Sequence, residues 1–468
     1  MSARAFAGRV GDLAGAMRAY RQRPGVRSTR EDLLALQRRR LVQTARHAAA
    51  ASVLYHELYG EIELSNDLEL RKLPVVTKEM LMGRFDEWVS DPRLRLREVQ
   101  AHMERIHEDE RYLGEYRCLV SSGTTGHQGV FVYGRDDWRQ LLAMVLRNSE
   151  LVGLPPGAGR RVRVATVTAT SPLHITGRAG IGLDLPGYPI RRLDAGTPLA
   201  ELVSALNEHR PAYLTGYASV LSLLAIEQLE NRLAISPRMV ATGGEVRSEE
   251  MTANIRNAWG VEPFNQYATT EGLFGSDCEH HQGIHVFEDL CLVEVVDEHA
   301  NPVPEGAVGA KLLFTSFISR SQPILRYEIT DRVSLTTAPC LCGRPLARII
   351  SLEGRSEDLL RFEGADGQRI IVHPYTLQST MAALPELRQY KIVNDPTGLH
   401  VLVRVRDGSD AQELSRRIEL ELRQQLQAAG VAAPRLDVTV VEEIPRQHGH
   451  AAKFTQIESR ETRSTPTY

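Results

Sequence analysis

The chain has 468 residues, of which 42% are hydrophobic and 25% are charged, and its formal net charge is −3. This length is enough for two or three domains with a large core. The nearly balanced charge argues against an electrostatic nucleic-acid binder, and no apolar run reaches the roughly 18 residues of a membrane span. Residues 1–25 lack the apolar core of a secretion signal. With only five cysteines, we expect a cytoplasmic protein that binds neither nucleic acid nor membrane.

The first clear helix signal follows Ser28 and Thr29. Ser28 and Glu31 have the spacing of a capping box, and a run rich in leucine and alanine follows them. A hydroxyl at the N-cap and a carboxylate three residues later both bond to backbone N–H groups that have no partner within the helix. The sequence therefore predicts a helix that begins near residue 30.

A run of hydroxyl side chains and glycines stands between two predicted strands, 117–120 and 129–133. Its members are Ser121, Ser122, Gly123, Thr124, Thr125 and Gly126. Glycine lets the backbone approach a ligand closely, and converging N–H and hydroxyl groups donate hydrogen bonds to phosphate oxygens. The alternative is an ordinary polar turn. The run is not a Walker loop, because no Lys-Ser/Thr pair follows its last glycine.

Beyond this run, strand-like and helix-like segments alternate. The predicted segments begin with a helix at 138–151 and a strand at 162–167, and the alternation continues through Leu206 and residues 213–214, 220–229 and 239–242. Such alternation is typical of an α/β fold with a largely parallel sheet. Short strands with turns between residues 309 and 335 predict a small β subdomain.

The pattern changes again after residue 354. Strands are predicted at 369–372, 390–393, 399–405 and 435–441, with helices at 374–384 and 411–428. This is a compact α+β arrangement of domain size, and the polar residues 458–468 are predicted to be disordered. We therefore predict an α/β protein with a large N-terminal domain (1–354) of layered sheets and a smaller, mobile α+β C-terminal domain (355–468).

Several further motifs follow the loop of residues 121–126 in a fixed order. They are Gly243-Gly244-Glu245, then Tyr267-Ala268-Thr269-Thr270-Glu271, then Asp331, then Gly354-Arg355. With these motifs the chain resembles the adenylate-forming superfamily of acyl-CoA synthetases, adenylation domains and luciferases. Within it, the chain is similar to phenylacetate-CoA ligases and coenzyme F390 synthetases. The resemblance extends from about Leu73 to about Glu458.

The resemblance implies ATP-dependent activation of an aryl carboxylic acid as an acyl-adenylate, release of pyrophosphate and transfer to CoA. An anionic carboxylate must then attack an anionic α-phosphate, which requires Mg²⁺ and positioned donors. The loop matches the family's loop over the β and γ phosphates, Thr270 the α-phosphate contact and Glu271 the Mg²⁺ ligand. The positions matching the family's adenosine contacts are Gly243, Gly244, Glu245 and Tyr267 for adenine, Asp331 for the ribose and Arg355 for the ribose or a phosphate.

The resemblance also places a catalytic lysine near the C-terminus, in a domain that rotates about a hinge at Glu357. The matching residue is Lys453, although the family usually has glycine where this chain has Ala452, and His450 competes for the role. A second departure follows the phosphate loop. The chain has Gly126-His127-Gln128-Gly129 where many relatives carry a lysine.

Cysteine and histidine occur at metal-ligand spacing in two stretches. Cys278, His281, Cys340 and Cys342 are four ligands of the kind that close a tetrahedral Zn²⁺ site. His280 or His285 are alternatives to His281, which we favour because two intervening residues suit a metal knuckle. A full ligand set implies a structural Zn²⁺. The other interpretation is buried free thiols with unrelated histidines.

The segment with His174 resembles the border of the family's acyl pocket, although a core histidine is the competing interpretation. Tyr213, Gly216 and Tyr217 resemble a second wall, and small residues beside rings suit an aromatic acid. The acceptor is CoA or, alternatively, a small nitrogen nucleophile such as an amine, hydroxylamine or nitrite. A non-catalytic adenylate-binding protein is a third interpretation, and homodimer formation is left open.

Overall fold

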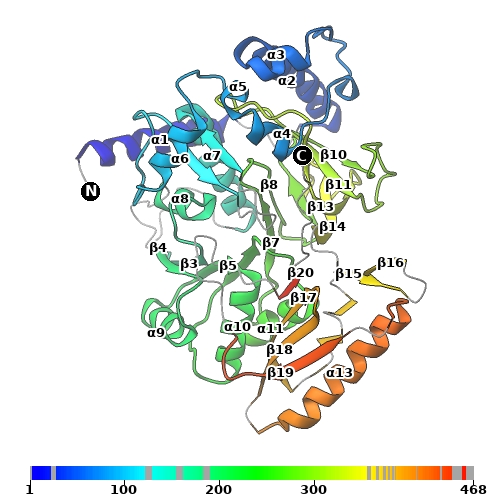
Figure 1. Ribbon diagram of the computed structural model, residues 1–468. Helices are drawn as coiled ribbons and strands as arrows, with labels where there is room; N and C mark the ends of the chain where they lie inside the picture. The colour runs from blue at the N-terminus through cyan, green and yellow to red at the C-terminus, as the bar shows by residue number, and fades with distance from the viewer. Residues whose placement is uncertain are drawn as a thin grey trace. The chain divides into compact units, whose positions relative to one another are not determined.

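The computed structural model (Figure 1) divides into two compact units, the first running to Leu352 and the second beginning at Glu353. The structure describes residues 3–22, 28–121, 129–153, 162–182, 190–355, 360–364, 368–372, 376–377, 380–381, 384, 386–406, 408–432, 435–444 and 456–459.

The first unit contains most of the helices. They are α1 (Ala3–Arg21), α2 (Arg30–Ala51), α3 (Val53–Leu58), η1 (Leu70–Lys72), α4 (Lys78–Gly83), α5 (Phe85–Trp88), α6 (Leu96–Met103), α7 (Arg135–Leu151), α8 (Ile175–Gly182), α9 (Leu199–His209), α10 (Ala218–Leu229) and α11 (Glu249–Trp259). No helix in the described ranges is both long enough and apolar enough to cross a membrane.

The described strands of this unit are β1 (Arg117–Val120), β2 (Val130–Tyr133), β3 (Val164–Thr168), β4 (Ile190–Asp194), β5 (Tyr213–Tyr217), β6 (Met239–Gly243), β7 (Phe264–Ala268), β8 (Phe274–Ser276), β9 (Ile284–Val286), β10 (Cys291–Val296), β11 (Lys311–Ser316), β12 (Tyr327–Ile329), β13 (Asp331–Thr336) and β14 (Arg348–Arg355). The last strand of this unit, β14, extends a few residues past Leu352.

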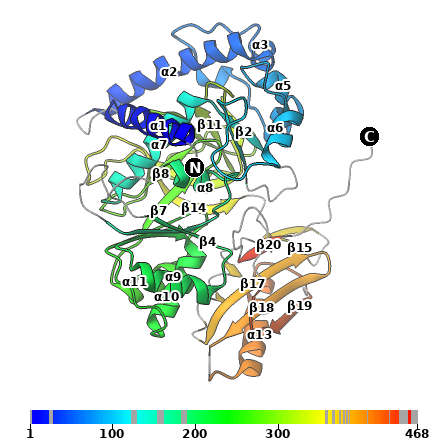
Figure 2. The ribbon, with the colours of Figure 1, turned by 90° about the vertical axis from the view of Figure 1, so that its left-hand side faces the viewer.

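A mixed sheet of nine described strands organises the first unit, in the order β13-β14-β9-β8-β7-β6-β5-β3-β4. Strands β3 to β7 are parallel to one another. The β7–β8, β8–β9 and β9–β14 pairs are antiparallel. Helices connect the parallel strands, and α9, α10 and α11 pack together on one side (Figure 2). The predicted α/β class with a largely parallel segment is confirmed.

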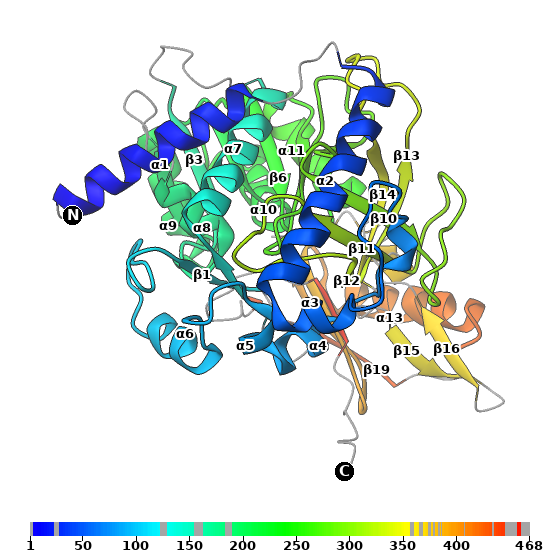
Figure 3. The same cartoon turned by 90° about the horizontal axis from the view of Figure 1, so that it is seen from above.

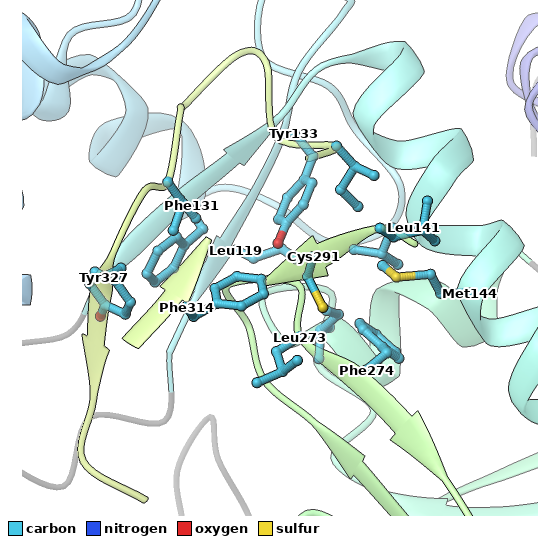
Figure 4. Packing of buried hydrophobic residues seen from close by; sticks show 14 of the residues in the cluster. Leu119, Phe131, Tyr133, Leu141, Met144, Leu273, Phe274, Cys291, Phe314 and Tyr327 are labelled. Carbon is cyan, nitrogen blue, oxygen red and sulfur yellow. The ribbon is translucent and has the colours of Figure 1, made fainter. Parts of the chain in front are cut away.

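Two further sheets complete the unit. Strands β1 and β2 form an antiparallel hairpin, and β10, β11 and β12 form an antiparallel sheet that corresponds to the predicted β subdomain. Their facing side chains share one hydrophobic core (Figure 4). In this core the rings of Phe131 and Tyr327 pack edge to face, with centroids 6.4 Å apart, an arrangement that aromatic pairs favour.

The N-terminal helices differ from the prediction in two ways. The capping box of α2 is formed by Thr29 and Asp32, whose side chains each accept the other residue's backbone N–H, rather than by Ser28 and Glu31. Helix α1 had no sequence signal that we recognised, and it lies along α7 (Figure 3). There Asp12 of α1 makes ion pairs with arginines of α7 and β1.

The second unit is an α+β domain, as predicted. Its described elements are β15 (Leu360–Glu363), β16 (Arg369–Val372), β17 (Leu387–Asp395), β18 (Gly398–Val405), α13 (Ala411–Ala428), β19 (Leu436–Val440) and β20 (Ile457–Ser459). Strands β19-β18-β17-β20 form one sheet, and α13 buries leucines and an isoleucine in the same core. The prediction of disorder from residue 458 is wrong for Glu458 and Ser459, because both pair with β17.

Candidate active site

The carboxyl ends of the parallel strands meet at one edge of the large sheet. Strands β3 and β5 are neighbours in the sheet. From β3 the chain passes through α8 to β4, which lies beside β3 on the side away from β5. From β5 it passes through α10 to β6, which lies beside β5 on the side away from β3. Such a reversal opens a crevice at the carboxyl ends of the two strands, where open α/β sheets bind ligands. Tyr217, Gly243 and Tyr267 stand at or next to the carboxyl ends of β5, β6 and β7.

Two tyrosines and two carboxylates join the segment after β7 to the segment around β12 and β13. The Tyr267 hydroxyl donates a hydrogen bond to Oδ2 of Asp331. The Tyr327 hydroxyl donates to Oε1 of Glu271 at 3.2 Å. All four residues are buried. The structure thus brings together three residues that the motifs predicted to contact adenosine and Mg²⁺.

Glu271 lies in the tight turn that connects β7 to β8. The turn is closed by backbone hydrogen bonds from Thr269 N to Leu273 O (2.9 Å) and from Gly272 N to Thr269 O (3.1 Å). The Tyr133 hydroxyl of β2 donates to the carbonyl oxygen of Thr270 at 2.5 Å. The position of the turn is therefore fixed from the β1–β2 hairpin as well as from its own strands. We did not anticipate Tyr133 or Tyr327, although Tyr327 stands within the Asp331 motif.

Glu245 stands beyond β6, in the motif predicted to form a wall against adenine. Its Oε2 accepts a hydrogen bond from the backbone N–H of Ser219, in the first turn of α10, at 3.0 Å. A carboxylate at this end of a helix is stabilised by unpaired N–H groups and by the helix dipole. This contact holds the Gly243-Gly244-Glu245 segment against the start of α10.

Tyr217 links the carboxyl end of β5 to the residue that follows β3. Its hydroxyl oxygen accepts a hydrogen bond from the backbone N–H of Ala169, just beyond β3, at 3.2 Å. Burial raises the pKa of this phenol. Next to it, Asp194 accepts hydrogen bonds from the N–H (3.0 Å) and hydroxyl (2.6 Å) of Thr170. His174 is buried at the start of α8, so this edge holds two of the four residues predicted to face the acid.

The other two residues predicted to contact the acid, Tyr213 and Gly216, make packing or hydrogen-bond contacts within the protein. Tyr213 begins β5, about 13 Å from Tyr217 at a strand rise of about 3.3 Å per residue, and its hydroxyl donates to the carbonyl oxygen of Gly153. It therefore lies at the opposite end of β5 from Tyr217, and its assignment to the acyl pocket stays a prediction. At Gly216 a Cβ atom would lie 2.6 Å from the carbonyl oxygen of Val167. Close packing of β5 on β3 thus accounts for this glycine without a ligand.

Ser121 and Gly129, at either end of the loop predicted to bind phosphates, are hydrogen-bonded to each other. Ser121 N donates to Gly129 O at 2.9 Å, and Gly129 N donates to the Ser121 hydroxyl oxygen at 2.9 Å. The remaining loop residues, Ser122, Gly123, Thr124, Thr125 and Gly126, lie outside the described residues, as do Lys453 and the side chain of Arg355. Their assigned roles stay predictions.

Four ligand-type side chains meet beside the far ends of β8 and β9. They are Cys278, His285, Cys340 and Cys342, whose ligand atoms all lie within 4.8 Å of one another. The Sγ atoms of Cys278 and Cys340 are 3.7 Å apart, and Cys342 Sγ lies 3.4 Å from His285 Nε2. Sulfur ligands of tetrahedral zinc lie about 3.8 Å apart when Zn–S bonds are about 2.3 Å, whereas a disulfide requires about 2.05 Å. The spacing fits a metal ion.

The fourth residue of this cluster is His285, not His281. Strand β9 carries His285 into the interior and lies close to β8. This approach is possible because β8 has a glycine at position 275: a Cβ atom there would lie 2.6 Å from the His285 carbonyl oxygen. The ring of His281 instead packs on Phe264, with centroids 4.6 Å apart. Strand pairing, which the spacing of ligands does not reveal, is the reason for this correction.

The members of the cluster differ in their electrostatics: although burial opposes it, hydrogen bonds from Arg344 lower the pKa of the Cys342 thiol. Burial raises the pKa of the Cys278 thiol to about 12. Burial, followed by the charges of Arg344 and Arg348, lowers the pKa of His285 to about 4. A neutral imidazole is the form that binds a metal, and a bound divalent ion would deprotonate coordinating thiols.

The chain is similar in sequence to phenylacetate-coenzyme A ligases. The chain is 30% identical to a phenylacetate-coenzyme A ligase of Thermus thermophilus over 288 residues, 59% of this chain and 62% of that protein. It is 24% identical to the Escherichia coli phenylacetate-coenzyme A ligase, covering 91% of this chain and 95% of that enzyme. The chain thus spans less than two thirds of the length of the first relative. No protein-family model matches it.

The fold has counterparts among solved structures. A 2-hydroxyisobutyryl-CoA ligase, in a postadenylation state with its acyl-AMP, matches with a TM-score of 0.70 at 20% identity, covering 92% of this chain and 90% of that one. The same ligase with acyl-AMP and CoA matches with a TM-score of 0.56. In sequence the chain is thus similar to phenylacetate-coenzyme A ligases, and in fold it is similar to a 2-hydroxyisobutyryl-CoA ligase.

Proposed function

We propose that the protein is an AMP-forming acid–CoA ligase. In the first step, a carboxylate oxygen attacks the α-phosphorus of ATP, which forms an acyl-adenylate and releases pyrophosphate. In the second step, the thiol sulfur of CoA attacks the acyl carbon, AMP leaves and the thiol proton is lost. The named activity of the sequence relatives supports this proposal.

The observation that carries the proposal is the pairing of the 267–271 and 327–331 segments through two tyrosine–carboxylate hydrogen bonds. Asp331 then binds the ribose hydroxyls, for which a carboxylate offers two acceptor oxygens. Thr270 contacts the α-phosphate. Glu271 presents a buried carboxylate, an oxygen ligand of the type that Mg²⁺ prefers, and the ion when bound offsets the charge of the phosphates.

The second unit supplies Lys453 in this proposal. An ammonium group near the reacting oxygens stabilises the negative charge that develops as two anions approach. Arg355 adds a contact to the ribose or to a phosphate. The resemblance in motif order supports both assignments, together with rotation of the second unit between adenylation and transfer.

CoA is the acceptor that the relatives favour, since the sequence relatives are named as CoA ligases and a structural relative was solved with CoA. We find no observation that favours a nitrogen nucleophile. The acid is an aromatic or arylalkanoic acid in our proposal, because phenylacetate is the acid named for the relatives and Tyr217 offers an aromatic side chain beside the crevice.

We also propose that Cys278, His285, Cys340 and Cys342 hold one structural Zn²⁺. The sulfur–sulfur spacing of 3.7 Å and four protein ligands support a closed site. Such a site would tie the β8–β9 loop to the loop between β13 and β14.

Pyrophosphate release with a panel of aromatic acids, measured with and without CoA, tests this function. Product analysis by mass spectrometry should identify an acyl-CoA whose formation depends on one class of acid. If the rate of pyrophosphate release does not change with CoA but rises with amines, hydroxylamine or nitrite, the nitrogen-acceptor reaction would replace this proposal.

A further inference from the structure

One buried carboxylate is shared by arginines from two separate elements. Asp109 Oδ1 accepts from Arg117 Nε of β1 at 2.7 Å, and its Oδ2 accepts from Arg117 Nη2 at 2.8 Å. Asp109 Oδ1 also accepts from Arg178 Nε of α8 at 3.1 Å. The side chains of Arg117 and Arg178 are 1% and 0% exposed, and that of Asp109 is 9% exposed. Interior charges of this kind require partners.

The two arginines belong to elements that lead to different parts of the candidate active site. Arg117 begins the strand that leads to Ser121, at the base of the phosphate loop. Arg178 follows His174 by one helical turn, and its backbone N–H donates to the His174 carbonyl oxygen at 2.9 Å. Asp109 therefore connects strand β1, which leads to Ser121, to helix α8, which begins directly after His174.

Arg178 also holds the turn that precedes its own helix. Its Nη1 donates to the carbonyl oxygen of Pro172 at 3.0 Å, and its Nη2 donates to the carbonyl oxygen of Glu110. From the other side, the backbone N–H of Val120 donates to the carbonyl oxygen of Leu173 at 2.9 Å. The 171–174 turn is thus bound both to β1 and, through Arg178, to the segment that carries Asp109.

A planar guanidinium suits this task because its donors point in fixed directions. Arg178 uses three of its nitrogens on three acceptors: a carboxylate oxygen and two carbonyl oxygens. Lysine would keep the charge but would present a single nitrogen, so it would not hold all three acceptors at once. The arrangement fixes where the turn lies as well as neutralising a buried charge.

We propose that Arg178 and Asp109 are positioning residues for the acid: they hold the 171–174 turn, and with it His174, in register with the strand that ends at the phosphate loop. The inference rests on the proposed function, in which His174 borders the acid. Neither residue touches substrate in this proposal. Their loss would displace the acid subsite while leaving the adenosine contacts around Tyr267 and Asp331 in place.

The test compares Arg178→Met, Arg178→Lys and Asp109→Asn with a matched buried ion pair elsewhere in the unit. Arg147 of α7 contacts both oxygens of Asp289 at 2.9 Å, and their side chains are 10% and 2% exposed. Arg147→Met is therefore the control for general loss of a buried pair. Phenylacetate is the probe acid, and pyrophosphate release gives KM for acid and for ATP.

We expect Arg178→Met and Asp109→Asn to raise KM for phenylacetate by about tenfold or more, because misplacing a reactant by about 1 Å is costly. KM for ATP should stay within about twofold. Arg178→Lys should lie between wild type and Arg178→Met. The inference is overturned if both KM values rise together, or if Arg147→Met raises KM for the acid equally. If Arg178→Met does not fold, Arg178→Lys and Asp109→Asn supply the same comparison.

Hydrogen exchange gives a readout that does not depend on activity. The Val120 amide and the His174 amide, which donates to Ser171 O at 3.1 Å, should exchange faster in Arg178→Met and not in Arg147→Met. Unchanged exchange at both amides would overturn the inference. Absence of pyrophosphate release by the wild-type protein with every acid would overturn the proposed function instead.

Discussion

The hydroxyl of Tyr267 donates a hydrogen bond to the carboxylate of Asp331, although the two residues are 64 positions apart in the chain. Each belongs to a separate motif, and each was assigned to adenosine from the motif order alone. Their contact means that the carboxylate assigned to the ribose is oriented by the residue assigned to adenine. The first prediction separates these two contributions.

Asp331→Asn should raise Kd for ATP by about 10- to 100-fold, because a hydrogen bond to a charged group contributes about 1.5–3 kcal/mol. Tyr267→Phe keeps the ring and removes only the orienting hydroxyl, so we expect a change of a few-fold at most. Titration calorimetry with ATP measures both. Equal losses for the two variants would mean that Asp331 acts only through Tyr267 and does not itself contact ATP.

The purified protein should contain one zinc ion per chain, and His285→Ala should lose it. His281→Ala is the matched control and should retain full occupancy, since its ring packs on Phe264. Cys278 and Cys340 are 62 residues apart, and a cross-link over such a loop stabilises by at most about 4 kcal/mol. Elemental analysis measures the zinc content of each variant, and thermal unfolding measures the stability that the metal cross-link adds. Zinc loss in His281→Ala with retention in His285→Ala would restore the original ligand prediction.

Asp109 should make stability depend on pH only in the acid range. Burial alone would raise the pKa of its carboxyl, but the hydrogen bonds from Arg117 and the charges of Arg117 and Arg178 hold it below the ordinary value of 3.8. A carboxyl with a lowered pKa stabilises the folded state above its unfolded pKa and loses that contribution as pH falls through the folded pKa.

Asp109→Asn should therefore cost about 3–5 kcal/mol at neutral pH, since it breaks a buried pair. The difference in Tm from the wild type should stay constant down to about pH 5 and shrink below about pH 4. Thermal unfolding over this range measures it. A difference that narrows already between pH 7 and pH 5 would mean that another group accounts for the effect.

Gly216→Ala should destabilise the sheet, because its Cβ atom would lie 2.6 Å from the Val167 carbonyl oxygen. Overpacking of this kind typically costs about 1–3 kcal/mol. Gly11→Ala on α1 is the control, since nothing lies within 4 Å of its added Cβ, and it should stabilise the helix by up to about 1 kcal/mol. Chemical unfolding compares the two. A neutral Gly216→Ala with altered acid selectivity would return Gly216 to the acyl pocket.

Lys453→Ala should slow adenylation by about 10²–10³, equivalent to about 2.7–4 kcal/mol of lost charge stabilisation. Transfer from preformed acyl-adenylate to CoA should change much less. His450→Ala is the control, because His450 is the competing residue. Single-turnover measurements of each half-reaction separate the steps, and a larger adenylation defect in His450→Ala would reverse the assignment.

The sequence was sufficient to predict the α/β class because alternating helices and β-branched strands depend on local periodicity. It missed β8 and β9, which are three residues each and too short to show a period. The same hairpin decides between His281 and His285, so the ligand set could not be chosen from spacing. Tyr213 and Tyr217 looked equivalent in the sequence, whereas the direction of β5 places them at opposite ends of that strand.

The contact between Asp12 and Arg117, 105 residues apart at 2.8 Å, has a consequence for synthesis of the chain. At about 5–20 residues per second, the ribosome finishes α1 roughly 5–20 seconds before it adds the arginine that pairs with this helix. During that interval Asp12 lacks this partner for burial. Helix α1 therefore cannot form this ion pair until Arg117 has been synthesised.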